Sequence, residues 1–197
     1  QTVRPGVHVD RYVVEAKLGE GGAAVVYRVR HRQLGTLHAL KVLRILAGSL
    51  TDRLIREGRI QATLKHPNIV AVTDVVRVGA FPALVMEHVA GLSLDGVLEQ
   101  YRPPPAEIDG LARDILEGMH AAHGQGMIHR DLKPGNVLLQ LTEHHVVAKI
   151  SDFGLARILD GDSVERSTRT SVMMGTPAYM APEQLRSAKD ADHRADV

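Results

Sequence analysis

The sequence predicts an α+β fold, with a strand-rich first part and a mainly helical second part. Residues 12–18, 25–30 and 37–43 are rich in alternating or β-branched apolar side chains, a pattern typical of strands. Between residues 108 and 122 the apolar positions recur at helical spacing instead, which indicates a helix with one buried face. A length of 197 residues is enough for one large domain or two small ones.

Composition and charge are those of an ordinary globular chain. Apolar residues make up 44% and the formal net charge is +1, so neither nucleic-acid binding nor a membrane surface is favoured. Cysteine is absent, which excludes disulfides and agrees with a cytoplasmic location. No apolar run approaches the ~20 residues of a spanning helix, although a membrane-anchored parent protein stays open. The chain starts without methionine and stops within a pattern, so we expect a piece of a longer protein.

The first two predicted strands flank a glycine-rich segment at residues 19–24. A hairpin of this kind lets backbone N–H groups approach a ligand closely, and phosphate oxygens are suitable acceptors for them. A flexible hairpin without a ligand explains the same residues, so both interpretations stay open at this point.

The third predicted strand carries a lysine, and a helix follows it. Lys41 interrupts the apolar run, and its ammonium needs a partner unless the strand lies at an exposed edge. Thr51 is expected to cap a helix that runs to about Lys65 and carries Glu57. Two further strands are predicted at residues 69–78 and 81–88, joined by a turn at Gly79.

The second part is predicted as helices and one hairpin. Ser93 is expected to cap a short helix, and residues 137–141 and 146–150 are expected to pair as strands. The turn between them holds His144 and His145, which a solvated hairpin explains better than a metal site. We expect the whole apolar stripe of the long helix to be core: Ile108, Leu111, Ala112, Ile115, Leu116, Met119 and Ala122.

The stretch around which the chain is organised runs from Met127 to Leu139 and is dense in polar groups. Asp131, Lys133 and Asn136 lie within it, between apolar flanks. Polar groups this dense are costly between buried elements unless they satisfy one another or bind something. Asp152 follows on a predicted turn, and acidic and amide oxygens beside an amine suit a hard cation that carries phosphates.

The order His-Arg-Asp-x-Lys-x-x-Asn, followed by Asp-Phe-Gly, resembles the catalytic core of eukaryotic-type (Hanks-type) protein kinases. The resemblance covers residues 12–197 but only the first part of the family's domain. It implies a two-lobed fold: a small ATP-binding lobe at residues 10–88, with an antiparallel sheet and one helix, and an incomplete helical large lobe at 89–197. Ala-Pro-Glu closes an activation segment that spans residues 152–183.

By this resemblance the chain uses ATP and Mg²⁺ and acts on a protein substrate. Asp131 would accept the proton of the acceptor hydroxyl, and Lys133 would neutralise the γ-phosphate. Asn136 and Asp152 would hold Mg²⁺. Lys133 also points to serine or threonine as the acceptor, as does Thr176 in the activation segment.

The resemblance also implies the nucleotide contacts. Lys41, paired with Glu57, would hold the α- and β-phosphates. Met86 would be the gatekeeper of the adenine pocket, and the backbones of Glu87 and Val89 would bond the adenine edge. The remaining contacts would come from Leu18, Gly19, Gly21, Val26, Ala39, Ser93 and Leu138.

The sequence around Ala-Pro-Glu is most similar to the corresponding segment of bacterial kinases, whose activation segments are phosphorylated. Thr168 and Thr170 are the expected autophosphorylation sites, modified in trans within a possible kinase dimer, with weaker candidates at Ser163, Ser167 and Ser171. Arg130 would pair with the added phosphate.

Two departures keep other functions open. Ala24 stands where the third glycine of the loop usually sits, so we expect weaker or slower nucleotide handling. Gln61 replaces an apolar residue expected against Phe153, so we expect weaker packing there and a less favoured active arrangement. A pseudokinase scaffold is one alternative, although no catalytic residue is lost. A small-molecule phosphotransferase is the other, and it normally lacks the Ala-Pro-Glu segment.

The incomplete large lobe leads to an expectation about the piece itself. We expect residues 1–197 alone to be inactive and aggregation-prone, with an exposed apolar patch on the long helix. Asp196, at a frayed end, would hold the catalytic loop poorly.

Overall fold

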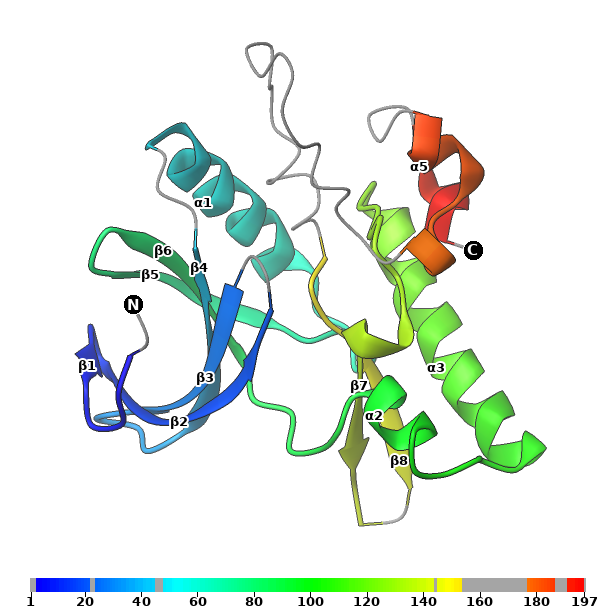
Figure 1. Ribbon diagram of the computed structural model, residues 1–197, viewed down its shortest axis with the longest axis horizontal. Coiled ribbons are helices and arrows are strands. Elements are labelled where there is room, and N and C mark those ends of the chain that lie inside the picture. The colour runs from blue at the N-terminus through cyan, green and yellow to red at the C-terminus, as the bar shows by residue number, and fades with distance from the viewer. Residues whose placement is uncertain are drawn as a thin grey trace. The chain divides into compact units, whose positions relative to one another are not determined.

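The computed structural model describes residues 3–21, 24–44, 48–143, 145–153, 177–186 and 191–196. The chain divides into two compact units, one formed by Gln1–Lys65 with Ala71–Val89 and the other by His66–Val70 with Ala90–Val197 (Figure 1). In the part of the chain that is described, no helix is both long and apolar enough to cross a bilayer.

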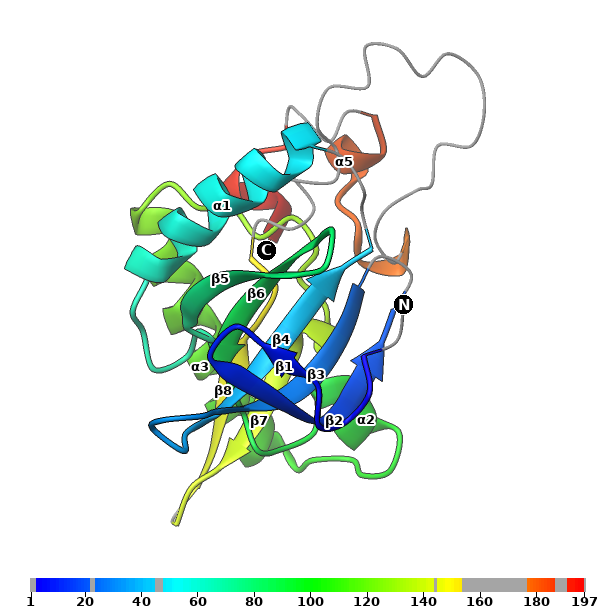
Figure 2. The same cartoon turned by 90° about the vertical axis from the view of Figure 1, so that its left-hand side faces the viewer.

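The first unit is a six-stranded antiparallel sheet with one helix, as the predicted fold class requires. The strand order is β1-β2-β3-β4-β6-β5 (Figure 2). The strands are β1 (His8–Val9), β2 (Tyr12–Glu20), β3 (Ala24–His31), β4 (Leu37–Leu43), β5 (Val72–Val78) and β6 (Phe81–Glu87). The predicted strands are confirmed, except that the one expected from residue 69 begins at Val72. The difference arises because Ile69 and Val70 pair with the second unit's strand at Ile150.

One face of this sheet is the core of the unit. Alternation along β3 sends Val25, Tyr27 and Val29 into it, and each is at most 3% exposed. Leu40 and Val85 from neighbouring strands are completely buried in the same cluster. Burying a side chain of this size stabilises the fold by about 1.5–3 kcal/mol. The core therefore holds the register of the strands that carry the other face.

Helix α1 (Gly48–Thr63) packs against β5 and β6. The contact is close at Gly58, where an added Cβ would lie 3.0 Å from Val75 Cγ2 and 3.1 Å from Leu84 Cδ2. The expected cap at Thr51 is wrong, because the helix has already begun at Gly48. Gln61, in the last part of α1, is buried.

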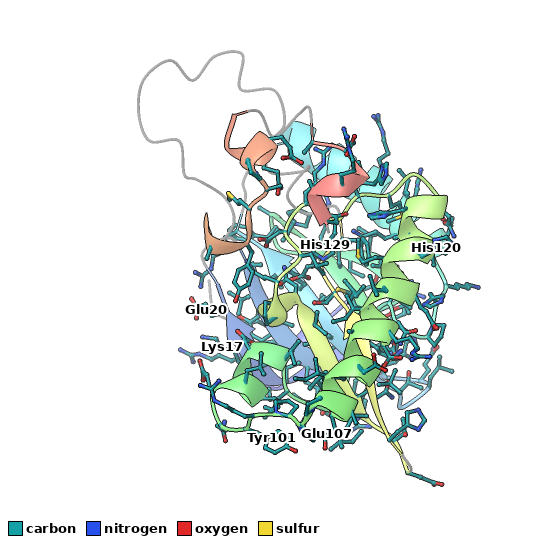
Figure 3. All side chains as sticks on the ribbon, turned by 90° about the vertical axis from the view of Figure 1, so that its right-hand side faces the viewer. Lys17, Glu20, Tyr101, Glu107, His120 and His129 are labelled. Atoms are coloured by element: carbon teal, nitrogen blue, oxygen red, sulfur yellow. The ribbon has the colours of Figure 1, made fainter. Side chains whose placement is uncertain are left out.

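The second unit is built on a hairpin, a long helix and short helical turns. Its elements are α2 (Leu94–Leu98), α3 (Pro105–Gly124), η1 (Pro134–Asn136), β7 (Val137–Leu141), β8 (Val146–Ile150), η2 (Pro177–Tyr179), α5 (Pro182–Arg186) and η3 (His193–Asp196). Helix α3 lies along the β7–β8 hairpin (Figures 1 and 3), where the Ala148 N–H donates to Asp114 Oδ2 at 2.8 Å. Both hairpin strands match their predicted bounds.

Residues 66–70 join this unit through backbone hydrogen bonds. The Ile150 N–H donates to the Asn68 carbonyl at 2.8 Å, and the Val70 N–H donates to the Ile150 carbonyl at 2.9 Å. The Asn68 side chain adds a bond from Nδ2 to the Ala148 carbonyl at 3.0 Å. Helix α3 comes close at Gly118, where an added Cβ would lie 3.0 Å from the Asn68 carbonyl oxygen. A short segment is thereby held as an extra edge of the hairpin.

The apolar stripe of α3 is only half buried, so the expectation that all of it is core is wrong. Met119 and Ala122 are buried, and Leu111 and Ile115 pack partly on the hairpin core. The outer part of the stripe is exposed: Ile108, Ala112 and Leu116. These three residues follow one another at i, i+4 spacing and form a row beside the buried one, which agrees with the expected exposed patch.

Two local expectations have mixed outcomes. Ser93 is the N-cap residue of α2, but its side chain makes no capping hydrogen bond. The hairpin turn closes through Thr142, whose hydroxyl donates to the His145 carbonyl at 2.7 Å and accepts from the His145 N–H at 3.1 Å. His144 lies outside the described residues.

Candidate active site

The loop at residues 129–136 is held in place by a buried aspartate at the far end of the chain. Asp196 Oδ2 accepts from the His129 N–H at 2.8 Å, and Oδ1 accepts from the Arg130 N–H at 2.7 Å. His123 Nε2 lies 2.9 Å from Oδ2, and the Asp196 side chain is 0% exposed. The expectation that Asp196 holds this loop poorly is wrong in the structure, because three polar groups satisfy its buried carboxylate.

His129 links this loop to the segment that follows β8. Its Nε2 lies 2.7 Å from the Ser151 carbonyl, and its Nδ1 accepts from the Asp131 N–H at 3.2 Å. These partners require a neutral ring with the proton on Nε2. Burial lowers the pKa of the imidazole and outweighs the bond to Ser151 and the nearby carboxylates. The ring also meets Phe153 edge-on, with centroids 4.8 Å apart, and Figure 3 shows it inside the unit.

The three predicted catalytic residues lie together. Lys133 Nζ is 3.1 Å and 2.8 Å from the two carboxylate oxygens of Asp131. Asn136 Nδ2 donates to the Asp131 carbonyl at 2.7 Å and to Oδ2 at 3.1 Å. Pro134 begins η1, where its fixed φ suits a first helical position and brings Asn136 back toward Asp131. A half-buried carboxylate oriented by a cation and an amide is suited to accept a proton from a hydroxyl.

The predicted metal ligands come from adjoining segments of the same unit. Ser151 donates to the Asn136 carbonyl from its N–H at 2.8 Å and from its hydroxyl at 3.1 Å, which places the residue before Asp152 against Asn136. The amide nitrogen of Asn136 is used by Asp131, so its Oδ1 is the atom left to act as a ligand. Asp152 has a φ of 69°, a left-handed backbone that is rare outside glycine and common at functional sites. A carboxylate and an amide oxygen are the ligand types that Mg²⁺ prefers, so these residues fit the ion.

Some of the predicted phosphate and adenine contacts of the first unit share the face of the sheet opposite its core: Val26, Ala39, Lys41 and Met86. Lys41 lies across from Val26 on β3 and from Leu84 on β6. Ala39, two residues earlier on the same strand, lies across from Met86. Strand register therefore places these side chains on one face. The side chain of Glu57 lies outside the described residues, and its pairing with Lys41 stays a prediction.

The glycine-rich hairpin forms between β2 and β3, with Gly19 opposite Val26. The Gly21 N–H donates to the Ala24 carbonyl at 2.9 Å. The expectation that the N–H groups here are free is therefore wrong for Gly21 in this conformation, because the hairpin itself uses the donor. Glu20 forms ion pairs with Lys17 and Arg44 that the sequence did not predict.

The remaining predicted contacts are spread over both units. Leu18 on β2 is 49% exposed, and Met86 is buried in β6. The Glu87 N–H donates to the Ala71 carbonyl at 2.8 Å, so any adenine bond of Glu87 must come from its carbonyl. In the second unit Ser93 and Leu138 form an isolated antiparallel bridge. Val89 is half-buried at the end of the first unit.

The sequence matches a known protein family. A model of the protein kinase domain matches residues 12–197. The chain belongs to the protein kinase family. Members of this family use ATP and a divalent metal, and the oxygen ligands of the second unit suit the metal. The observed sheet, helix and catalytic loop are thus parts of a kinase domain.

The kinase's curated relatives are bacterial serine/threonine kinases. It is 37% identical over 190 residues to serine/threonine-protein kinase pkn2 of Myxococcus xanthus, which covers 95% of this chain and 23% of the relative. It is 39% identical over 192 residues to PknL of Mycobacterium tuberculosis, which covers 95% of this chain and 46% of the relative. The chain therefore spans less than half the length of these relatives.

A solved structure supports the kinase fold. The kinase domain of Mycobacterium tuberculosis PknI, a double mutant, matches with a TM-score of 0.74 and 27% identity. The match covers 100% of this chain and 72% of that chain. The two-lobed, kinase-like fold class is confirmed.

Some predicted residues of the kinase site lie outside the described structure, and two residues that contribute to the site were not predicted. Residues 154–176, with Thr168, Thr170 and Thr176, lie outside the described residues. His123 and Gln184 contact the catalytic loop or its anchor, and the sequence analysis did not single out either of them. His123 lies 73 positions from its partner Asp196 and Gln184 lies 54 positions from Arg130, so only the folded chain reveals these contacts.

Proposed function

We propose that the protein containing this chain transfers the γ-phosphate of ATP to a serine or threonine hydroxyl of a protein substrate, with Mg²⁺ as cofactor. The observation that carries the proposal is the cluster of Asp131, Lys133 and Asn136 on a loop that Asp196 fixes. The naming of the relatives as serine/threonine kinases supports the same acceptor.

Asp131 performs the proton transfer in this proposal. Its carboxylate takes the proton of the substrate hydroxyl while the hydroxyl oxygen forms a bond to the γ-phosphorus and the bond to ADP breaks. Lys133, which contacts the same carboxylate, would neutralise the phosphoryl oxygens as their charge develops. Asn136 and Asp152 would hold Mg²⁺, which supplies charge neutralisation to the phosphates when bound.

The first unit would bind the nucleotide. Lys41 and Glu57 would hold the phosphates, and the adenine would contact the hinge backbone at Glu87 and Val89. The shared face of Val26, Ala39, Lys41 and Met86 supports this assignment. The other proposed contacts are Leu18, Gly19 and Gly21 in this unit, with Ser93 and Leu138 from the second unit.

Regulation by phosphorylation belongs to the same proposal. Thr168 and Thr170 would be modified in trans within a kinase dimer, and Arg130 beside the catalytic aspartate would pair with the phosphate. No observation favours a pseudokinase, since the lysine, aspartate and asparagine of the motifs are all present.

The test compares Asp131→Asn with wild type in the full-length protein, using ATP, Mg²⁺ and a generic basic protein as acceptor. We expect kcat to fall by about a thousandfold or more while ATP binding survives, because the aspartate acts on the acceptor. Asp109→Asn is the matched control, since Asp109 is an exposed residue on α3 that pairs with Arg113. Unchanged turnover in Asp131→Asn would rule out the mechanism.

A further inference from the structure

Gln184 joins the end of the activation segment to the catalytic loop. Its Nε2 donates to the Arg130 carbonyl at 2.7 Å. Its Oε1 accepts from the Ala181 N–H at 3.0 Å. A single amide thus uses both of its ends, one on its own helix and one on the residue that precedes the catalytic aspartate.

The helix end of this contact is a capping interaction. Helix α5 begins at Pro182, so Ala181 is its N-cap residue and Gln184 stands at the third helical position. A glutamine or glutamate at that position commonly reaches back to the N-cap N–H. Either residue would therefore cap α5, but an ionised glutamate, unlike glutamine, has no donor to offer to the Arg130 carbonyl.

The loop end of this contact is a strained residue. Arg130 has a φ of 67°, a left-handed conformation that is unfavourable for a residue other than glycine. Such a residue keeps its conformation only where its surroundings over-determine it. Asp196 Oδ1 accepts from its N–H at 2.7 Å, and Gln184 donates to its carbonyl. The two side chains therefore hold Arg130 by both of its backbone polar groups.

The same contact orients the peptide group that enters the catalytic aspartate. That group consists of the Arg130 carbonyl and the Asp131 N–H. Its oxygen accepts from Gln184 Nε2, and its N–H donates to His129 Nδ1 at 3.2 Å. Rotation of this peptide would move the Asp131 carboxylate away from Lys133 and Asn136.

We propose that Gln184 is a positioning residue for the phosphoryl transfer, which couples the placement of α5 to the orientation of Asp131. The inference rests on the proposed kinase function. Movement of α5, which ends the activation segment, would thereby be transmitted to the catalytic aspartate through one side chain.

The test uses the full-length protein and the variants Gln184→Glu and Gln184→Leu. Gln184→Glu keeps the cap on Ala181 and loses the donor to Arg130, so kcat should fall about tenfold, with KM for ATP and Tm near wild type. Gln184→Leu loses both bonds and should lower kcat at least as far. Gln100→Glu and Gln100→Leu are the matched controls, because Gln100 is exposed after α2 and its side chain makes a long 3.4 Å bond to the Gly96 carbonyl.

A pH series separates positioning from a general loss of structure. A protonated glutamic acid can donate to the Arg130 carbonyl and still accept from Ala181. The kcat of Gln184→Glu relative to wild type should therefore rise as the pH falls from about 8 to about 6, through the range of a carboxyl with a raised pKa. The ratio for Gln184→Leu should stay flat. Wild-type kcat in Gln184→Glu, or parallel pH responses of the two variants, would overturn the proposal.

A second readout does not depend on activity. Amide hydrogen exchange of a peptide covering residues 127–134 should be faster in both Gln184 variants than in wild type and in the Gln100 controls. If wild type transfers no phosphate, the proposed function fails, and the exchange data alone decide whether Gln184 holds the loop. Unchanged exchange in both Gln184 variants would refute that role.

Discussion

The two units hold their functional residues by different means. In the first unit Lys41 and Ala39 sit on a strand, and a buried apolar core on the opposite face sets their register. In the second unit Asp131 sits on irregular backbone, and the preceding Arg130 is held by its N–H, which donates to Asp196, and by its carbonyl, which accepts from Gln184. In the sheet, many weak apolar contacts fix the position of a residue. In the polar loop, a few hydrogen bonds do so.

This difference predicts which single substitutions should lower turnover and which should lower only stability. Apolar cores tolerate changes of similar volume with modest losses. A buried polar network that loses one member leaves the others unsatisfied, which costs more than the single bond. Changes in the sheet core should therefore lower stability first, and changes in the loop network should lower turnover as well.

The prediction with the largest expected effect concerns Asp196, the residue that anchors the catalytic loop. Asp196→Asn places an amide where two backbone N–H groups need acceptors, so the free energy of unfolding should fall by about 3 kcal/mol. The kcat should fall about a hundredfold while KM for ATP changes little, because the nucleotide contacts of the first unit are untouched. Urea denaturation and steady-state kinetics on the full-length protein measure both quantities.

Asp192→Asn is the matched control for this change, since Asp192 lies in the same segment and is exposed in a pair with Arg194. The contrast between the units would be lost if Asp196→Asn lowered stability without lowering kcat.

The second prediction tests the sheet core. Leu40 is completely buried, so Leu40→Ala should cost about 3 kcal/mol of unfolding free energy. At a temperature where the variant stays folded, kcat should remain within about twofold of wild type, because the core acts on stability and not on the reacting groups. Leu34→Ala, at a turn residue 72% exposed, should change neither quantity. A large fall in kcat at full folding would contradict the comparison.

The third prediction concerns pH. The folded protein keeps His129 neutral, because burial lowers the pKa of this ring below its ordinary value near 6.5. The unfolded chain binds a proton there first, so the stabilisation is complete above pH 6.5 and is lost as the pH falls below it. The slope contributed by one such group reaches at most about 1.4 kcal/mol per pH unit.

Thermal unfolding between pH 5 and 7 should show a shallower slope in His129→Phe than in wild type. His120→Phe is the control, since His120 points outward from α3 (Figure 3) and should keep the wild-type slope. Equal slopes in all three proteins would show that another group is responsible.

The prediction with the smallest expected effect concerns Gln61, a buried polar residue of the first unit. Gln61 is 8% exposed, and its Nε2 has no hydrogen-bond partner among the described residues. Gln61→Leu replaces this donor with apolar volume of similar size and should raise the unfolding free energy by about 1 kcal/mol. Gln33→Leu, at an exposed turn, should leave stability unchanged. A destabilised Gln61→Leu would show that the amide has a role in folding.

The expectation that Gln61 disfavours the active arrangement stays a prediction. A rise in kcat with Gln61→Leu, measured on unphosphorylated protein, would support it.

The sequence predicted the strands well because alternation reports burial directly, as β3 and β4 show. It also predicted the grouping of Asp131, Lys133 and Asn136, whose spacing lies within one loop. Other expectations required knowledge of distant neighbours. The burial of Leu116 depends on what lies beside α3, and the strand start at Val72 depends on Ile150 taking the preceding residues.

The same reason explains the errors at the loop. Asp196 and Gln184 act more than fifty positions away from the residues that they bond. Chain position suggested a weakly held end for Asp196, whereas satisfied donors keep its carboxylate buried. Local patterns describe a residue's own element, and the partner of a buried polar group is a property of the fold.

Residues 66–70 belong to the second unit although they lie between two segments of the first. This arrangement has a consequence for the order of folding. The hairpin of the second unit receives its extra edge from a segment that is synthesised before β5 and β6. The first unit in turn cannot close its sheet until residue 87 has been made. A cut at residue 89 would keep every segment of the first unit in one piece and would deprive the later piece of the segment that bonds Ile150, so the second unit alone would be incomplete. The chain crosses between its units more often than one linker would require, so the second unit depends on a segment that lies within the first unit's stretch of the sequence.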